Sequence, residues 1–224
     1  MKNYIKQKKS EEKNYTLNGI TILVRDSVSD DINVKNVIEK AMTLVPRNLF
    51  KFIKKINIGQ FEILNSRELD ALYKDNTIYL TNLQKSEFDM LDDIVHEVAH
   101  SLEEAYSDLI YSDGKIKKEF ITKRKMMQKH LKHAGYHISP EKYSIASYDE
   151  DFDIFLYQDV GYKTLSSLTS SLFLSPYAAT SLREYFANGF ENILLSQESY
   201  QILRKLSPRL FEKLIELISL EEEK

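Results

Sequence analysis

The feature that most constrains this fold is an amphipathic helix predicted over residues 87–102. Its apolar residues form one stripe at 100° per residue, as in a helix that packs on a core: Leu91, Ile94, Val95, Val98, Ala99 and Leu102. Ser86 suits the N-cap position, and Asp89 three residues later completes a capping-box pattern. The two signals agree, so we expect a rigid helix with one face free for other chemistry.

That other face carries the sequence "HEVAH", from His96 to His100. Histidines four residues apart on a helix lie on one face, about 6 Å apart along its axis, so both can reach one zinc ion. Glu97 then leans over the open position of the ion, where it can take a proton from a water molecule. The alternative is an ordinary surface helix, but two neutral imidazoles opposite the apolar stripe have no packing reason to be there.

A catalytic zinc site takes three protein ligands and a water. The chain has no cysteine, so the third ligand must be His, Asp or Glu. The histidine expected in a metzincin would stand at position 106, which is Tyr106. Glu103 belongs to the same helix and would have to bend back past His100. Three further histidines follow in or just after a basic segment: His130, His133 and His137.

The stronger candidate for the third ligand lies in residues 175–195. Ser175 suits the N-cap and Pro176 the first position of a helix predicted over residues 176–195. One face of that helix would carry Tyr177, Ser181, Glu184, Asn188 and Glu191. A solvated polar face is the alternative interpretation. Gly189, which costs about 1 kcal/mol relative to alanine inside a helix, is expected to allow close approach to the "HEVAH" helix.

"HEVAH", followed some 80 residues later by "YAATSLREYFANGF", resembles the catalytic domain of anthrax lethal factor and the clostridial Pro-Pro endopeptidases. These zinc metallopeptidases share HExxH, a tyrosine, and a glutamate seven residues after that tyrosine. The resemblance covers roughly residues 70–195 in order and spacing, and it is strongest at the two motifs.

The resemblance implies one Zn²⁺ held by His96, His100 and Glu184. It also implies Glu97 as general base and Tyr177 as the hydroxyl that steadies the developing oxyanion. Many relatives have a second glutamate where this chain has Asn188, so the residue that supports the ligands stays open between Asn188 and Glu191. The basic segment after the "HEVAH" helix is a second departure.

The rest of the chain predicts an α+β fold, which the resemblance specifies as zincin-like. Strands are predicted at residues 19–25 and 54–64, with a helix at 30–45 between them. A hairpin is predicted at residues 71–82. Its return segment, residues 77–82, is expected to be either the edge strand that pairs with an extended substrate or an ordinary sheet strand.

The predicted organisation is a flexible basic tail at residues 1–15 and one metallopeptidase domain at 16–224. That domain would comprise the sheet and active-site helix (16–105), a basic helical insert (106–150) and a helical C-terminal lobe (151–224). In the lobe, helices are predicted at residues 176–195, 199–206 and 208–223.

Net charge and hydropathy indicate which classes of partner to expect. The net charge is −3, so no nucleic-acid partner is expected. No apolar run approaches the roughly 18 residues that span a bilayer, so no membrane association is expected. The charged N-terminus, starting at Met1, lacks the apolar core of a secretory signal. The predicted location is therefore cytoplasmic, or outside the cell after release without a classical signal. The oligomeric state stays open.

The sequence thus predicts a zinc metalloendopeptidase that hydrolyses a protein or peptide substrate. One alternative is a zinc-binding, non-catalytic structural or assembly protein of a phage or mobile element that keeps the protease fold. Another is an interaction module that acts through residues 115–133, which hold eight Lys or Arg residues against one Glu.

Overall fold

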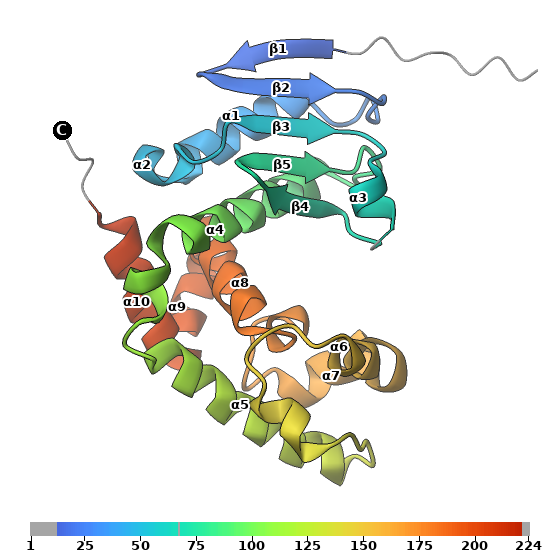
Figure 1. Ribbon diagram of the computed structural model, residues 1–224, viewed down its shortest axis with the longest axis vertical. Coiled ribbons are helices and arrows are strands. Elements are labelled where there is room, and N and C mark those ends of the chain that lie inside the picture. Colours follow the sequence, from blue (N-terminus) through green and yellow to red (C-terminus); the bar gives the residue numbers. More distant parts are fainter. Residues whose placement is uncertain (1–12, 67, 221–224) are drawn as a thin grey trace, which may run out of the picture.

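The N-terminal part of the chain is a mixed five-stranded sheet in the order β1-β2-β3-β5-β4, and the rest is mostly helical (Figure 1). The structure is a computed structural model that describes residues 13–66 and 68–220. The strands are β1 (Lys13–Leu17), β2 (Ile20–Val24), β3 (Lys55–Ile58), β4 (Ala71–Lys74) and β5 (Thr77–Leu80). The fold is therefore α+β, as predicted.

Two tight turns fix the ends of the sheet. Asn18 and Gly19 both have positive φ and join β1 to its antiparallel partner β2. Asp75 and Asn76 do the same between β4 and β5. β5 also pairs in parallel with β3, so it lies inside the sheet and β4 is the edge strand. Of the two interpretations left open for residues 77–82, the ordinary sheet strand is therefore confirmed and the substrate-pairing edge is excluded.

Two other strand predictions need correction. Lys13, Asn14 and Tyr15, predicted as tail, are part of β1, while residues 1–12 lie outside the described part of the chain. The strand predicted at 54–64 ends at Ile58, and Glu62–Asn65 forms the short helix α3. Gly59 follows the strand, and only glycine fits there because a Cβ would lie 2.6 Å from the Asp26 carboxylate.

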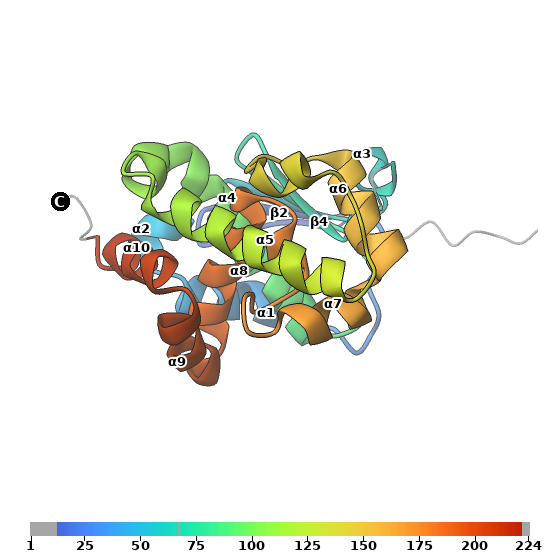
Figure 2. The same cartoon turned by 90° about the horizontal axis from the view of Figure 1, so that it is seen from below.

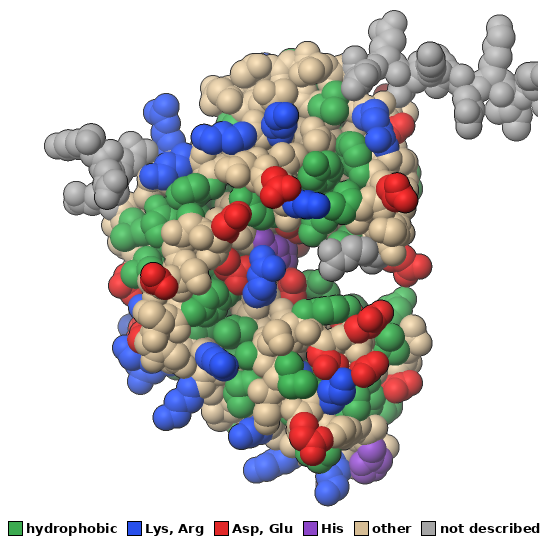
Figure 3. Space-filling view, viewed as in Figure 1, with side chains coloured by type: hydrophobic (Ala, Val, Ile, Leu, Met, Phe, Trp, Pro, Cys, Tyr) green, Lys and Arg blue, Asp and Glu red, His purple; other side chains and the backbone are tan. Residues whose placement is uncertain are grey.

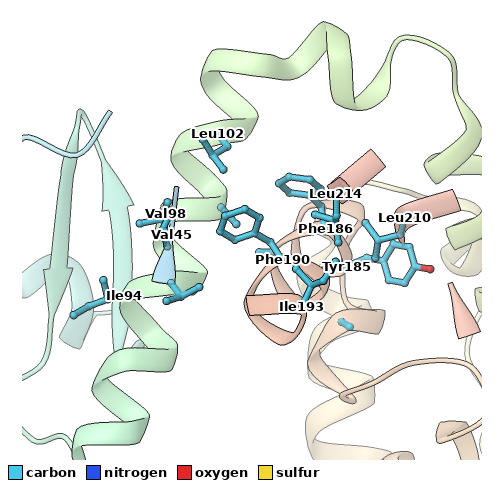
Figure 4. Packing of buried hydrophobic residues seen from close by; sticks show 14 of the residues in the cluster. Val45, Ile94, Val98, Leu102, Tyr185, Phe186, Phe190, Ile193, Leu210 and Leu214 are labelled. Atoms are coloured by element: carbon cyan, nitrogen blue, oxygen red, sulfur yellow. The ribbon is translucent and has the colours of Figure 1, made fainter. Parts of the chain in front are cut away.

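The longest helix, α4 (Glu87–Tyr111), lies between the sheet and the C-terminal helices (Figure 1). It extends past the predicted end near residue 102, and past the boundary predicted at 105, with a kink at Tyr106. Figure 4 shows Ile94 on the side of the sheet and Phe190 of α8 (Leu182–Leu195) pointing back toward α4. Because α4 is covered on both sides, four polar residues of its middle part are buried too: Glu97, His100, Ser101 and Glu103.

The remaining helical elements complete the fold. They are α1 (Val34–Leu44), α2 (Arg47–Phe50), α5 (Lys115–His133), η1 (Pro140–Ser144), α6 (Glu150–Ile154), η2 (Phe155–Val160), α7 (Tyr162–Thr169), η3 (Tyr177–Ala179), α9 (Gln197–Leu206) and α10 (Pro208–Ile218). The helix predicted at 208–223 is confirmed as far as Ile218. No helix within residues 13–66 and 68–220 is long and apolar enough to cross a membrane.

The basic helix α5 runs across the helical half of the molecule (Figure 2). Two of its cations are structural. Arg124 is fully buried, donates to the carbonyls of Lys142 and Ile145, and stacks on Phe152. Buried Lys123 donates to the Leu172 carbonyl and to Ser207. The other lysines of the helix are exposed: Lys115, Lys117, Lys118, Lys125, Lys129 and Lys132.

Gly189 also has a different role from the one predicted. A Cβ at this position would lie 2.6 Å from Cδ2 of Leu210 and 3.2 Å from Cδ1 of Leu214. Both leucines belong to α10. The glycine therefore permits close packing of α8 on α10, and not on the active-site helix.

Candidate metal site

Two helices bring three potential metal ligands together. His96 and His100 lie one turn apart on α4, and Glu184 lies in the first turn of α8. One ligand atom from each residue lies within 4.8 Å of the other two. Nε2 of His96 is 3.0 Å from one oxygen of Glu184, and Nε2 of His100 is 3.6 Å from the other. Both imidazoles thus turn the same nitrogen toward one carboxylate.

The helix that carries Glu184 starts later than predicted. Tyr177–Ala179 forms a separate 3₁₀ turn, and α8 begins at Leu182. Ser181 caps α8 by accepting the Glu184 N–H, and the Leu182 N–H donates to the Ala146 carbonyl. The prediction that Tyr177 and Glu184 lie on one continuous helix face is therefore wrong. Ser175 caps only the short turn, by accepting the Ala178 N–H.

Tyr177 nevertheless reaches the site. Its ring centroid is 6.4 Å from that of His96, and 36% of the residue is exposed. Burial, and the negative charge of Glu184, raise the pKa of the Tyr177 hydroxyl. The hydroxyl therefore stays protonated and able to donate a hydrogen bond.

A carboxylate holds the second nitrogen of each histidine. Nδ1–H of His96 donates to Glu191 at 2.5 Å, and Nδ1–H of His100 donates to Glu103 at 2.7 Å. A histidine whose Nδ1 carries the proton presents the lone pair of Nε2, and carboxylates in this position orient metal-binding histidines. The two carboxylates thus set the tautomer and direction that shared coordination requires.

Further polar groups fix these supporting carboxylates. The Asn188 amide donates to Glu191, and Asn192 donates to the same oxygen at 3.2 Å. The sequence left open whether Asn188 or Glu191 supports the ligands. Glu191 contacts His96 directly, and Asn188 contacts Glu191.

Glu103 has its own partners. It accepts from the Tyr111 hydroxyl, and from Arg183 Nε at 3.1 Å. Sequence reasoning weighed Glu103 only as a ligand and missed the other two residues. The spacing of three residues from His100 could have indicated the support role of Glu103.

The charges around His96, His100 and Glu184 favour the binding of a cation. Burial lowers the pKa of His100, but hydrogen bonds to Glu103 and Glu184 outweigh this effect and raise the pKa to about 9. Burial raises the pKa of Glu184, but the two histidines together bring it well below its usual range. A divalent cation can supply the positive charge that protons otherwise provide, and imidazole with carboxylate is a common donor set for zinc.

Glu97 lies on α4 between the two histidines and is buried. Its Oε2 accepts the backbone N–H of Tyr73, on edge strand β4, at 2.5 Å. Burial raises the pKa of the Glu97 carboxyl. The sheet edge therefore fixes the direction of this carboxylate.

A pocket of about 480 Å³ opens beside His100, between β4 and the C-terminal half of α4. Its lining includes Tyr73, Glu104, Tyr111 and Arg183. Figure 3 shows the hollow between the sheet half and the helical half of the molecule, with histidine and carboxylate side chains inside it. His100, one of the candidate ligands, thus faces a pocket that a molecule from solution can enter.

The later histidines are not part of this site. Nδ1–H of His130 donates to the Leu168 carbonyl. Neither His130 nor His133 nor His137 belongs to the metal-ligand group found in the described residues.

Comparison of the chain with known protein families, characterised proteins and solved structures gave no match. The resemblance to lethal factor and the Pro-Pro endopeptidases therefore stays a prediction. What the structure establishes is a possible metal site of His96, His100 and Glu184 in an α+β fold.

Proposed function

We propose that this protein is a zinc-dependent metalloendopeptidase with a zincin-like site. The observation that carries the proposal is the convergence of His96 Nε2, His100 Nε2 and Glu184, while carboxylates hold both Nδ1 atoms. Three protein ligands with room for a water are the arrangement of catalytic zinc, whereas structural zinc sites use four.

The residues around these ligands have roles that suit hydrolysis. When bound, zinc supplies a Lewis acid for the scissile carbonyl and makes a water molecule more acidic. Glu97, held by the Tyr73 N–H, takes the proton of the attacking water and passes it to the leaving amine. The Tyr177 hydroxyl donates a hydrogen bond to the oxyanion, a contact typically worth roughly 3 kcal/mol of barrier.

Zinc content, measured by elemental analysis, tests the ligand set. We expect one zinc per chain in the wild type, loss of zinc in Glu184→Ala, and full retention in Glu198→Ala, which alters an exposed glutamate of α9. Circular dichroism confirms that each variant is folded. A wild type that stays free of zinc after loading would overturn the proposal.

Turnover tests the catalytic role on the same samples, with denatured proteins as substrate and mass spectrometry as readout. Glu97→Gln keeps an oxygen that can accept the Tyr73 N–H, so zinc should be retained. Loss of the general base should lower turnover by about 10²–10⁴-fold. If zinc-loaded wild type and Glu97→Gln are equally inactive, the protein is a zinc-binding protein without catalysis.

A further inference from the structure

Four tyrosines of the helical half, between residues 148 and 177, are called the aromatic wall here. They are Tyr148, Tyr157, Tyr162 and Tyr177. Tyr148 is 54% exposed and Tyr157 is 58% exposed, although both are large aromatic residues. Tyr157 lies in η2 and Tyr162 in α7, and in Figure 1 this part of the helical half lies opposite β4 and α3.

The local backbone turns the ring of Tyr157 toward solvent. Residues Phe155–Val160 form a π-helical turn, η2, in which Phe155, Leu156 and Val160 are buried and Tyr157 is exposed. The Gly161 N–H closes the turn on the Leu156 carbonyl, and Gly161 has a φ of +76°. Such turns are rare in proteins, and those that occur are often found at functional sites.

The glycine also reverses the chain so that Tyr162 packs on Tyr157. The two ring centroids are 5.5 Å apart, with an interplanar angle of 61°. This edge-to-face pair fixes the orientation of Tyr157 although most of its side chain faces solvent. The wall therefore offers a preformed aromatic surface.

The wall begins beside the candidate metal site. Tyr177 is its inner end, with its ring 6.4 Å from the ring of His96. At the outer end, the Tyr148 hydroxyl donates to Asp153 at 3.2 Å. Burial, and the nearby carboxylates of Asp153 and Glu184, raise the pKa of the Tyr162 hydroxyl to about 12, so this hydroxyl stays protonated at neutral pH.

We infer that the aromatic wall is a substrate subsite that binds an aromatic side chain close to the scissile bond. An exposed apolar patch with a polar rim marks a ligand-binding groove. Ring pairs gain energy beyond the area that they bury, so an aromatic side chain fits this wall better than an aliphatic one. This inference rests on the proposed function, because the occupant is the substrate of the same site.

The test uses the full zinc-loaded chain and a synthetic peptide library in which Phe, Leu and Ala are equally frequent at every position. Mass spectrometry locates the cleavage sites. A matched pair of peptides, with Phe or Ala at the preferred position, then gives kcat/KM for the wild type and three variants. Tyr157→Ser and Tyr148→Ser alter the wall, and Ile202→Ser alters an apolar residue of α9 that is 43% exposed.

We expect Phe to be enriched at one position near the cleaved bond. Tyr157→Ser should lower kcat/KM for the Phe peptide by about tenfold, leave the Ala peptide within about twofold, and Ile202→Ser should change neither. Cleavage without aromatic enrichment, or enrichment that survives in both wall variants, would overturn the inference and leave the proposed function standing. Zinc binding without cleavage of any peptide would overturn both.

Discussion

At the scale of single residues, the site depends on which nitrogen of each histidine is engaged. Glu103 and Glu191 hold the Nδ1 atoms, and Nε2 of each histidine is left to face Glu184. A histidine that lost its carboxylate could rotate or change tautomer, and the lone pair needed for zinc would point elsewhere. Metal affinity should therefore depend on residues that never touch the metal.

Glu103→Gln should weaken zinc binding by about 10–100-fold, because its partner His100 loses the charged acceptor that orients it. Titration with a competing chelator measures the change. The adjacent Glu104→Gln is the matched control, since Glu104 is exposed and accepts a hydrogen bond from the Tyr73 hydroxyl and not from a histidine. Equal affinities in the two variants would contradict the support role.

The pH dependence of stability can be predicted at Lys123. Burial lowers its pKa to about 8, from 10.5. Below pH 8 the lysine is charged in both folded and unfolded chains, and the fold bears the cost of burying that charge. Between about pH 8 and 10.5, Lys123 has lost its proton in the folded chain but keeps it in the unfolded chain. The folded state then no longer buries a charge, so its stability rises with pH.

Relative to Lys123→Met, which has no charge to bury, wild type should gain up to about 3 kcal/mol of unfolding free energy across this window. Urea unfolding of both proteins at about pH 7 and about pH 10 measures the difference. Other titrating groups are common to both proteins and cancel. A difference that does not change with pH would show that the lysine is uncharged, or well solvated, at neutral pH.

How far single residues could be predicted depends on how local their contacts are. His96, Glu97 and His100 follow from helical spacing alone. Arg183 bonds to Glu103 across 80 positions of the chain, and no periodicity encodes such a contact. Supporting residues that contact the site from a distant part of the chain, such as Arg183, are therefore the ones that the sequence could not identify.

At the scale of elements, the site requires that α8 start at Leu182 and pack on α4. Periodicity predicted one helix from 176 to 195, because Tyr177, Glu184 and Glu191 share its spacing. The break comes from tertiary contact, since the Ala146 carbonyl accepts the Leu182 N–H and Ser181 takes over the cap. The strand pattern of residues 77–82 was likewise recognised, but strand order across the sheet was not readable from it.

Gly189→Ala tests the packing of α8 on α10. The added Cβ would lie 2.6 Å from Leu210 Cδ2, so either the leucine side chains or the two helices must shift. Overpacking costs about 1–3 kcal/mol, partly offset by about 1 kcal/mol from the better helix propensity of alanine. We expect a net loss of about 1 kcal/mol in urea unfolding.

Leu210→Ala supplies the matching test. Because it removes the clashing atoms, Gly189→Ala should cost less in that background than in the wild type. Strictly additive effects of the two substitutions would argue against direct contact.

At the scale of the whole molecule, a bound metal joins the two halves, because His96 and His100 lie on the helix below the sheet and Glu184 lies in the helical half. Zinc at a thousand times its Kd should stabilise the fold by about 4 kcal/mol. For a chain of this size, that raises Tm by about 10 °C. Thermal unfolding with zinc and with chelator measures the shift, and Glu184→Ala should show little of it. An equal shift in that variant would place the metal elsewhere.

The packing of α10 on Gly189 also bears on when the site can form during protein synthesis. A ribosome makes α4, with both histidines, long before it makes α8, and α10 is made later still. Since the leucines of α10 cover the back of the helix that carries Glu184, the third ligand is held firmly only after α10 has emerged. A growing chain would therefore meet a metal ion with two histidines first, and would complete the candidate metal site only after α10 has formed.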